Sequence, residues 1–213
     1  MNNKRKQNLV AFHQDTIIKE ANELFKKKGI AKTTMDDIAR ASGYSKSTVY
    51  VYFKSKDDIF QHIIYNCVVM IRDQLRQLTA QHENGADFYN AVCTMLIEMH
   101  DQNPVFFEGI SGKTILVAND NITPSIIEKT DAARAEIHAL LLERLSKSNK
   151  SHLIRDDIDR LELVYILWSC IYGIIEMGNA KSDYIRNKFK KERNEFIRQG
   201  LGNLLRLVYK PGM

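Results

Sequence analysis

Between Gly29 and Ile59 the chain reads GIAKTTMDDIARASGYSKSTVYVYFKSKDDI. The paired threonines at 33–34 are residues that cap a helix start, and the Asp36-Asp37 pair favours the positive end of a helix dipole. Gly43 permits a tight corner after two helical turns, and Ser45 can cap a further short helix. Two short helices around a glycine turn make a helix-turn-helix, so this segment predicts that motif.

The second helix of the motif is expected over residues 46–53. Val49 and Phe53 lie four residues apart and form an apolar anchor, so the other face must point outward. That outward face combines basic, hydroxyl and aromatic side chains: Lys46, Ser47 and Tyr50, flanked by Thr48 and Tyr52. Such a face suits close approach to a nucleic acid.

Outside this segment the pattern remains helical. Only three prolines and ten glycines occur among 213 residues, and apolar residues recur mostly at three- and four-residue steps. We expect an all-α protein of about nine helices: an N-terminal helix-turn-helix domain over 1–58 and a helical ligand-binding and dimerisation domain over 59–213. Apart from the two short helices, we place helices at about 9–28, 55–78, 86–101, 104–110, 124–147, 156–178 and 183–208.

The charge distribution sets the N-terminal part apart. Residues 1–60 hold 12 Lys/Arg and 7 Asp/Glu, which leaves 19 of the 31 basic and 19 of the 26 acidic side chains for the rest. The whole formal excess of +5 therefore lies N-terminally. This is expected of a segment that meets a polyanion, although a merely solvated basic face would give the same count.

The segment 29–59 resembles the DNA-binding signature of the TetR family of bacterial regulators. The matching features are the Thr-Thr cap, the Asp-Ile-Ala helix, the corner glycine, the Ser-capped helix ending Tyr-x-Tyr-Phe, and the following Lys-x-x-Ile. The resemblance implies that Thr34 contacts a phosphate. It also implies that Ser47, Thr48 and Tyr50 face the major groove, with Lys46 at the start of the same helix. Tyr52 and Lys56 would contact the DNA backbone. Hydroxyl groups, helix-start N–H groups and Lys suit phosphate oxygens, which is consistent with these roles.

The resemblance also implies a homodimer, because one short recognition helix contacts too few base pairs for specific binding. Its double-stranded operator would be pseudo-palindromic. The interface would lie on the last two long helices, with these candidates: Leu161, Tyr165, Phe196, Leu201, Leu204 and Leu205. An unidentified small ligand, apolar or amphipathic, would release a repressor of this type, and candidate pocket residues are Tyr65, Tyr89, Met95, Met99, His100, Phe106, Phe107, Trp168 and Tyr172. Each of these could instead be ordinary core.

Several classes are disfavoured. No GxGxxG, Walker, GxSxG, HExxH or CxxC motif occurs, so we expect no enzyme, no catalytic residues, no cofactor and no metal site. The three cysteines stand far apart in apolar stretches and suit reduced packing residues. The start Met-Asn-Asn-Lys-Arg-Lys lacks the apolar stretch of a signal peptide, and no run of about 18 uncharged apolar residues appears. We therefore expect a cytoplasmic protein without membrane contact.

One alternative keeps the DNA-binding fold but replaces the small ligand with a protein partner, or assigns a nucleoid or division role. A cavity below about 300 Å³ would favour that alternative. Activation instead of repression is a further alternative, which the sequence does not separate because it depends on the position of the operator relative to a promoter.

Overall fold

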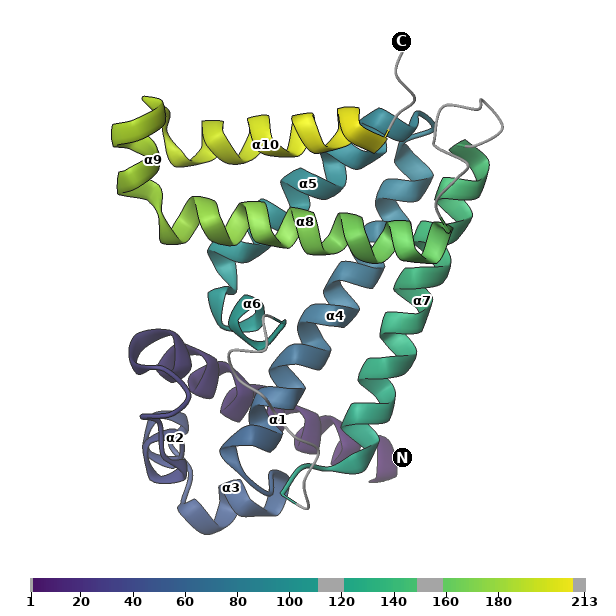
Figure 1. Cartoon of the computed structure of the whole chain (residues 1–213). Helices are drawn as coiled ribbons and strands as arrows, with labels where there is room; N and C mark the ends of the chain where they lie inside the picture. Colours follow the sequence, from purple (N-terminus) through teal and green to yellow (C-terminus); the bar gives the residue numbers. More distant parts are fainter. Residues whose placement is uncertain (1, 111–120, 149–158, 209–213) are drawn as a thin grey trace. The chain divides into compact units, whose positions relative to one another are not determined.

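The computed structural model describes residues 2–110, 121–148 and 159–208 of the chain. Within these ranges it has ten α-helices and no strand, which confirms the all-α prediction (Figure 1). Their bounds are α1 Asn2–Lys28, α2 Met35–Ser42, α3 Lys46–Tyr52, α4 Lys56–Gln81, α5 Gly85–Gln102, α6 Pro104–Ile110, α7 Pro124–Ser148, α8 Arg160–Ala180, α9 Ser182–Phe189 and α10 Arg193–Val208.

The chain forms two compact units that do not follow a single cut in the sequence. The first unit comprises 1–70 and 103–133, and the second comprises 71–102 and 134–213. The long helices α4 and α7 each contribute their first part to the first unit and their last part to the second. The domain boundary expected after residue 58, between the DNA-binding and the ligand-binding domain, stays a prediction.

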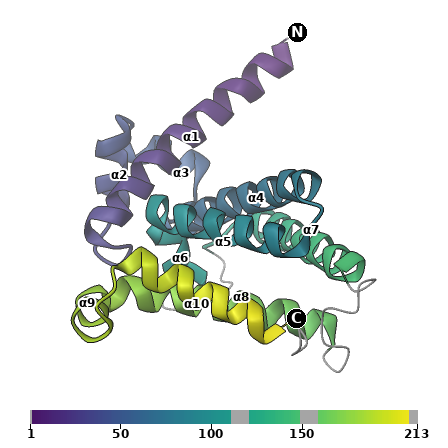
Figure 2. The ribbon, with the colours of Figure 1, turned by 90° about the horizontal axis from the view of Figure 1, so that it is seen from above.

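The first unit is built on α1, which packs against α2 and extends beyond the α2–α3 pair at its N-terminal end (Figure 2). Ile17, Ala21 and Phe25 of α1 are buried on one stripe of the helix. They share this core with Ile38 of α2 and Val49 of α3. The expected start of α1 near residue 9 is too late, because the basic residues after Asn2 continue the helix as exposed turns.

The second unit contains α8 and α10 side by side, joined through α9 at one end (Figure 1). Gly178 allows this close approach, because a Cβ there would collide with Cγ1 of Ile197, which is itself fully buried. By length and composition α8 also qualifies as a membrane span, with a mean hydropathy of 1.4, but a single such helix is weak support for a membrane location.

The single helix expected over 183–208 is wrong. Lys190 adopts the left-handed conformation, with φ 56° and ψ 37°, and its N–H bonds to the Arg186 carbonyl to end α9. Helix α10 then begins at Arg193. The predicted helix over 156–178 corresponds to α8, and its first three positions, 156–158, lie outside the described residues.

Two cysteines pack in the cores as expected. Cys67 and Cys93 are free and buried, and burial raises the pKa of each thiol to about 11. Cys170 is free and half-buried. The described helices contain no cluster of three His, Cys, Asp or Glu side chains that could hold a metal ion.

Candidate functional site

Helix α3, the expected recognition helix, is a short helix held by its caps and by two buried side chains. Ser45 is the N-cap: its Oγ accepts the Thr48 N–H at 3.1 Å and lies 2.8 Å from the Ser47 hydroxyl. Val49 and Phe53 are 0% and 1% exposed, which confirms the predicted anchor. Burial of one stripe leaves the opposite stripe of α3 in solvent.

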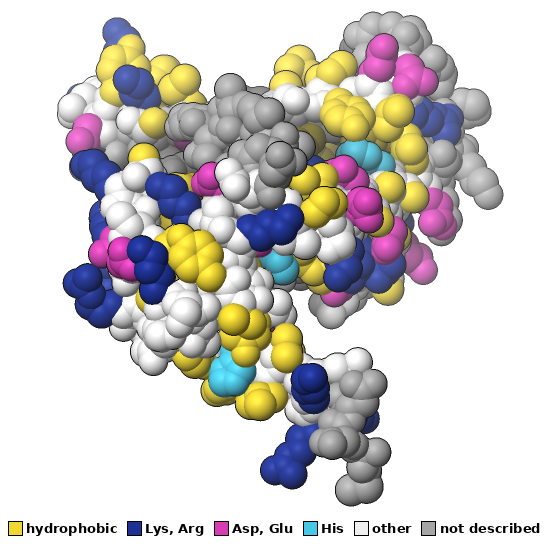
Figure 3. Space-filling view, turned by 90° about the horizontal axis from the view of Figure 1, so that it is seen from below, with side chains coloured by type: hydrophobic (Ala, Val, Ile, Leu, Met, Phe, Trp, Pro, Cys, Tyr) yellow, Lys and Arg dark blue, Asp and Glu magenta, His cyan; other side chains and the backbone are white. Residues whose placement is uncertain are grey.

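The solvent-facing stripe holds the residues predicted to read DNA. Tyr50 is 48% exposed, Ser47 and Lys46 are exposed, and Thr48 is half-buried. Val51 is 77% exposed, the highest exposure among the large apolar side chains of the described residues. Lys and Arg side chains are spread over this end of the first unit, with hydrophobic side chains among them (Figure 3).

Thr34 caps α2 through a reciprocal capping box. Its Oγ1 accepts the Asp37 N–H at 3.1 Å, and the Asp37 carboxylate accepts the Thr34 N–H at 3.0 Å. The Lys28 ammonium also donates to Asp37, at 2.6 Å, and these bonds hold the pKa of Asp37 far below its ordinary value. The Asp37 N–H is therefore used within the capping box, while Thr34 itself is exposed at the start of α2.

Lys46 bridges the two helices of the motif. Its ammonium lies 3.0 Å from the Asp36 carboxylate on α2, and this hydrogen bond raises the pKa of Lys46. Both side chains are more than half exposed, so solvent screens the pair and it adds little to stability.

Tyr52 belongs to an aromatic cluster that attaches α3 to α1. Its ring lies 5.7 Å from the ring of His13, and His13 Nδ1 lies 2.6 Å from the Tyr44 hydroxyl. Tyr44 follows the corner residue Gly43, whose φ of 75° only glycine adopts readily. Tyr52 is therefore half-buried at the edge of the exposed face rather than free in solvent.

Lys56 occupies a different position from the one expected of a phosphate contact. Its ammonium donates to three carbonyls of the α1–α2 connection: Ile30 at 2.9 Å, Ala31 at 3.1 Å and Thr33 at 3.1 Å. An ammonium has three donors, and all three are used here. The structure therefore gives Lys56 a positioning role under α2.

Comparisons with known proteins agree with this geometry. The family model for bacterial regulatory proteins of the tetR family matches residues 17–63, the stretch that contains the C-terminal part of α1, all of α2 and α3, and the start of α4. Residues 17–63 are therefore similar to the DNA-binding region of the tetR family of regulators.

Similarity to individual curated relatives concentrates in a short part of the chain. An uncharacterized HTH-type transcriptional regulator, YfiR of Bacillus subtilis (strain 168), is 43% identical over 51 residues, 24% of this chain and 25% of that protein. The negative regulator of the biofilm operon icaADBC, IcaR of Staphylococcus aureus (strain Newman), is 32% identical over 75 residues, 35% of this chain and 38% of that protein. The matches thus span well under half of each relative.

Solved structures share the fold over most of the chain. The fatty acid degradation regulator FadR from Bacillus halodurans superposes with a TM-score of 0.65 at 14% identity, covering 90% of this chain and 94% of that one. The TetR-family regulator PfmR from Thermus thermophilus gives 0.65 at 20% identity, covering 89% and 97%. FadR from Thermus thermophilus, solved with lauroyl-CoA, gives 0.60 at 18% identity, covering 90% and 93%.

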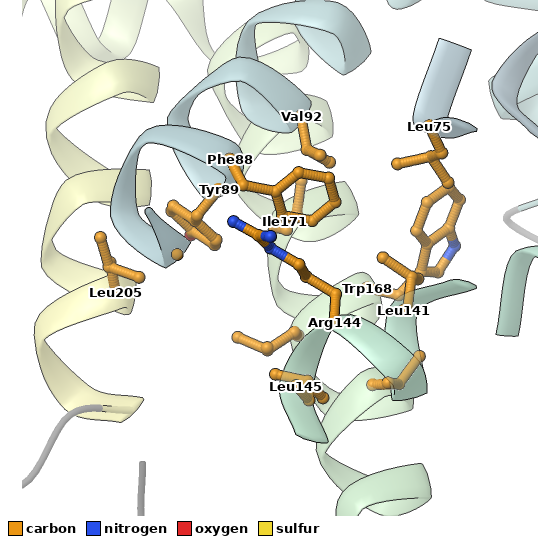
Figure 4. Close-up of a pocket in the computed structure, with 13 residues that line it drawn as sticks. Leu75, Phe88, Tyr89, Val92, Leu141, Arg144, Leu145, Trp168, Ile171 and Leu205 are labelled. Carbon is orange, nitrogen blue, oxygen red and sulfur yellow. The ribbon is translucent and has the colours of Figure 1, made fainter. Parts of the chain in front are cut away.

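The second unit contains an apolar pocket of about 100 Å³. Aliphatic and aromatic side chains make up nearly all of its wall (Figure 4), which consists of Leu75, Gly85, Phe88, Tyr89, Val92, Leu141, Arg144, Leu145, Val164, Leu167, Trp168, Ile171 and Leu205. The Tyr89 hydroxyl donates to the Leu201 carbonyl at 3.0 Å, and burial raises the pKa of Tyr89. The charged member of this wall is Arg144.

Two of the nine predicted pocket residues, Tyr89 and Trp168, line this pocket. Four others belong to the same unit but not to the wall: Met95, Met99 and His100 are buried on α5, and Tyr172 is half-buried on α8. His100 instead lies 3.1 Å from the Asn179 amide and 3.7 Å from the Glu176 carboxylate.

The remaining three predicted pocket residues belong to the first unit: Tyr65 on α4, and Phe106 and Phe107 on α6. Phe106 and Phe107 are 1% and 2% exposed and pack edge to face, with ring centroids 5.5 Å apart. Arg144 was not predicted, because an arginine within an amphipathic helix is usually a surface residue.

The residues predicted for the dimer interface differ in their exposure to solvent. Leu161 and Tyr165 of α8 are 44% and 52% exposed, and Phe196 and Leu204 of α10 are half-buried. Leu205 lines the pocket, and Leu201 is 2% exposed within the core of its own unit. Burial in its own unit leaves Leu201 little surface for a second copy.

Proposed function

We propose that the protein is a sequence-specific DNA-binding transcriptional regulator that acts as a homodimer on a pseudo-palindromic operator. The observation that carries the proposal is that α3 has one buried face and one exposed face. Val49 and Phe53 hold the helix from behind, while Ser47 and Tyr50 are exposed. Short hydroxyl side chains and a tyrosine on a Ser-capped helix are suited to base edges and phosphates. We expect the protein to act in the cytoplasm, because its DNA partner lies there.

Dimerisation is supported by the exposed apolar side chains of α8. This helix has the apolar composition of a membrane span, yet it leaves four large apolar side chains about half exposed: Leu161, Tyr165, Ile166 and Met177. Exposed apolar side chains of this kind are buried when two copies pair about a twofold axis. The same pairing would supply two recognition helices to the two half-sites.

Release by a small ligand is the mode of regulation that we favour. IcaR is named a negative regulator, and the Thermus thermophilus FadR structure holds lauroyl-CoA. The name of IcaR supports a repressor, and the lauroyl-CoA complex of FadR supports a small ligand. The ligand would act by binding the DNA-free state more tightly than the DNA-bound state.

Regulation by a protein partner is the second candidate, and the small volume of the pocket that Arg144 lines favours it. The pocket of about 100 Å³ is smaller than the roughly 300 Å³ at the lower end of small-molecule sites. A ligand of ordinary size would therefore require the wall to move, whereas a protein partner would not.

The experiment that tests the proposed function is selection of genomic DNA fragments by the purified protein, repeated with Tyr50→Ala and with Tyr184→Ala. Tyr184 is 59% exposed on α9 and serves as the matched control. We expect wild type and Tyr184→Ala to select the same inverted repeat, and Tyr50→Ala to lose preference for it while retaining affinity for random DNA. Equal losses on selected and random DNA would exclude base reading by Tyr50.

A further inference from the structure

We propose that the pocket of the second unit binds a compact hydrophobic molecule carrying one anionic group, and that the Arg144 guanidinium is its counter-charge. The inference deepens the proposed function and rests on it, because it names the chemical class of the ligand. The observation behind it is a buried cation in an apolar wall, which is independent of the DNA-binding surface.

Arg144 is buried without a negative partner among the described residues. The side chain projects from α7 and is 8% exposed overall. One Nη2 hydrogen bond goes to the Glu83 carbonyl at 2.5 Å, and the guanidinium carbon lies 5.1 Å from the centre of the Phe88 ring. The Nε–H is buried and has no hydrogen-bond partner in the described part of the chain.

These contacts compensate only part of the burial of a full charge. A carbonyl dipole and an aromatic face are neutral partners, and a buried guanidinium normally requires a carboxylate or phosphate. The unused Nε donor matters because Nε and one Nη form the planar fork that binds two oxygens of one anion. Arg144 therefore has an unused Nε–H to offer an anionic head group, next to the Nη2 that donates to Glu83.

The surroundings of Arg144 determine the rest of the ligand. Figure 4 shows the guanidinium extending toward Phe88 and Tyr89, with Leu141 and Trp168 on the other side of the space. Among the described residues of the wall, none is acidic, so the local charge is positive. An anion would meet no negative side chain among the described residues of the wall, whereas the positive charge of Arg144 would repel an ammonium compound.

The volume limits the apolar body. A dry apolar cavity of about 150 Å³ is enough for benzene, and the present pocket has about 100 Å³. The pocket is smaller than that, so we expect a body no larger than one ring, with Leu75, Val92 and Ile171 moving outward to admit it. Larger ligands of the same class would need further outward movement of these side chains.

The test uses the full-length protein and four probes with one body: phenylacetate, benzylphosphonate, 2-phenylethanol and 2-phenylethylamine. Trp168 is the single tryptophan of the chain and lines the pocket, so its fluorescence reports occupancy without DNA. Calorimetry gives the affinities. We expect at least one of the two anions to bind about tenfold or more tightly than both the alcohol and the amine. The two anions distinguish a carboxylate from a phosphonate ligand.

Three variants assign the preference to Arg144. Arg144→Met should bring the anion affinity down to that of the alcohol. Arg144→Lys keeps the charge but not the fork, and should lose part of the preference. Arg134→Met, an exposed arginine ten residues earlier on α7, is the matched control and should behave like wild type.

Equal binding of all four probes, binding of none, or an anion preference that survives in Arg144→Met would each overturn the inference. If Arg144→Met does not fold, the comparison between wild type and Arg144→Lys decides. DNA binding is measured in parallel without any probe. Absence of DNA binding by the wild-type protein would contradict the proposed function. The fluorescence result would still test the ligand class separately.

Discussion

The Asp58 carboxylate and Thr123 are joined by two hydrogen bonds. Thr123 N–H donates to Oδ1 at 2.9 Å, and the Thr123 hydroxyl donates to Oδ2 at 3.1 Å. The same carboxylate accepts the Lys54 N–H at 2.9 Å, and Asp58 is fully buried. One side chain therefore joins the α3–α4 connection, the first turn of α4 and the residue before α7.

Asp58→Ala should destabilise the protein by at least about 2 kcal/mol. It leaves the Lys54 and Thr123 N–H groups without their acceptor, and hydrogen bonds to a charged group each contribute about 1.5–3 kcal/mol. Urea unfolding followed by circular dichroism gives the loss. Asp57→Ala, the neighbouring first-turn acid, removes only a dipole interaction and should cost under about 1 kcal/mol. Similar losses for the two variants would exclude the role given to Asp58.

Lys56→Met should lower stability rather than alter the salt dependence of DNA binding. The ammonium group already donates to three carbonyls, so its loss leaves the α1–α2 connection without these donors and should cost about 1–2 kcal/mol. Lys32→Met removes an exposed charge nearby and is the control for folding. If Lys56→Met left stability unchanged and made DNA binding less salt-dependent, the result would instead support a phosphate contact by Lys56.

Acidification should weaken the first unit through His62. Burial lowers the pKa of His62 from 6.5, and its ring packs edge to face against Phe53 with centroids 5.1 Å apart. The unfolded chain then binds the proton more readily, so the free energy of unfolding falls as the pH drops through about 6.5. The decline between about pH 8 and about pH 5 should be smaller in His62→Gln. An identical decline in both proteins would remove His62 as the cause.

Two glycine-to-alanine substitutions should have opposite effects. Gly178→Ala places a Cβ against the buried Ile197 side chain and should cost about 1–3 kcal/mol by overpacking. At Gly202 on α10 the added Cβ meets nothing within 4 Å, so Gly202→Ala should gain up to about 1 kcal/mol of helix propensity. Thermal unfolding compares them directly. A stabilised Gly178→Ala would show that α8 and α10 are less closely packed.

Local signals made the N-terminal motif predictable. Each helix boundary there has a residue whose own chemistry causes it: Thr34 and Ser45 supply capping oxygens, and Gly43 supplies a positive φ. The pair Val49 and Phe53 identifies the inner face of α3 by spacing alone. All of these effects act within about one helical turn, which is the range over which sequence patterns are informative.

Effects between distant residues could not be predicted in this way. The end of α9 at Lys190 carries no glycine signal, because a lysine adopts the left-handed conformation only where the surrounding structure requires it. The acceptors of Lys56 lie 23 to 26 residues away, and the Arg144 contact to Glu83 spans 61. Such partners depend on tertiary packing, so the positioning role of Lys56 and the buried cation of the pocket appear only in the structure.

The exposure of Val51 has a consequence for the sequence that the protein would bind. A branched aliphatic group that is 77% exposed on α3 keeps most of its contact with water in the folded chain. In a major groove its natural apolar neighbour is the 5-methyl group of thymine. We therefore expect each half-site to carry an A·T pair opposite Val51, and replacing that thymine with uracil should weaken binding by wild type but not by Val51→Ala.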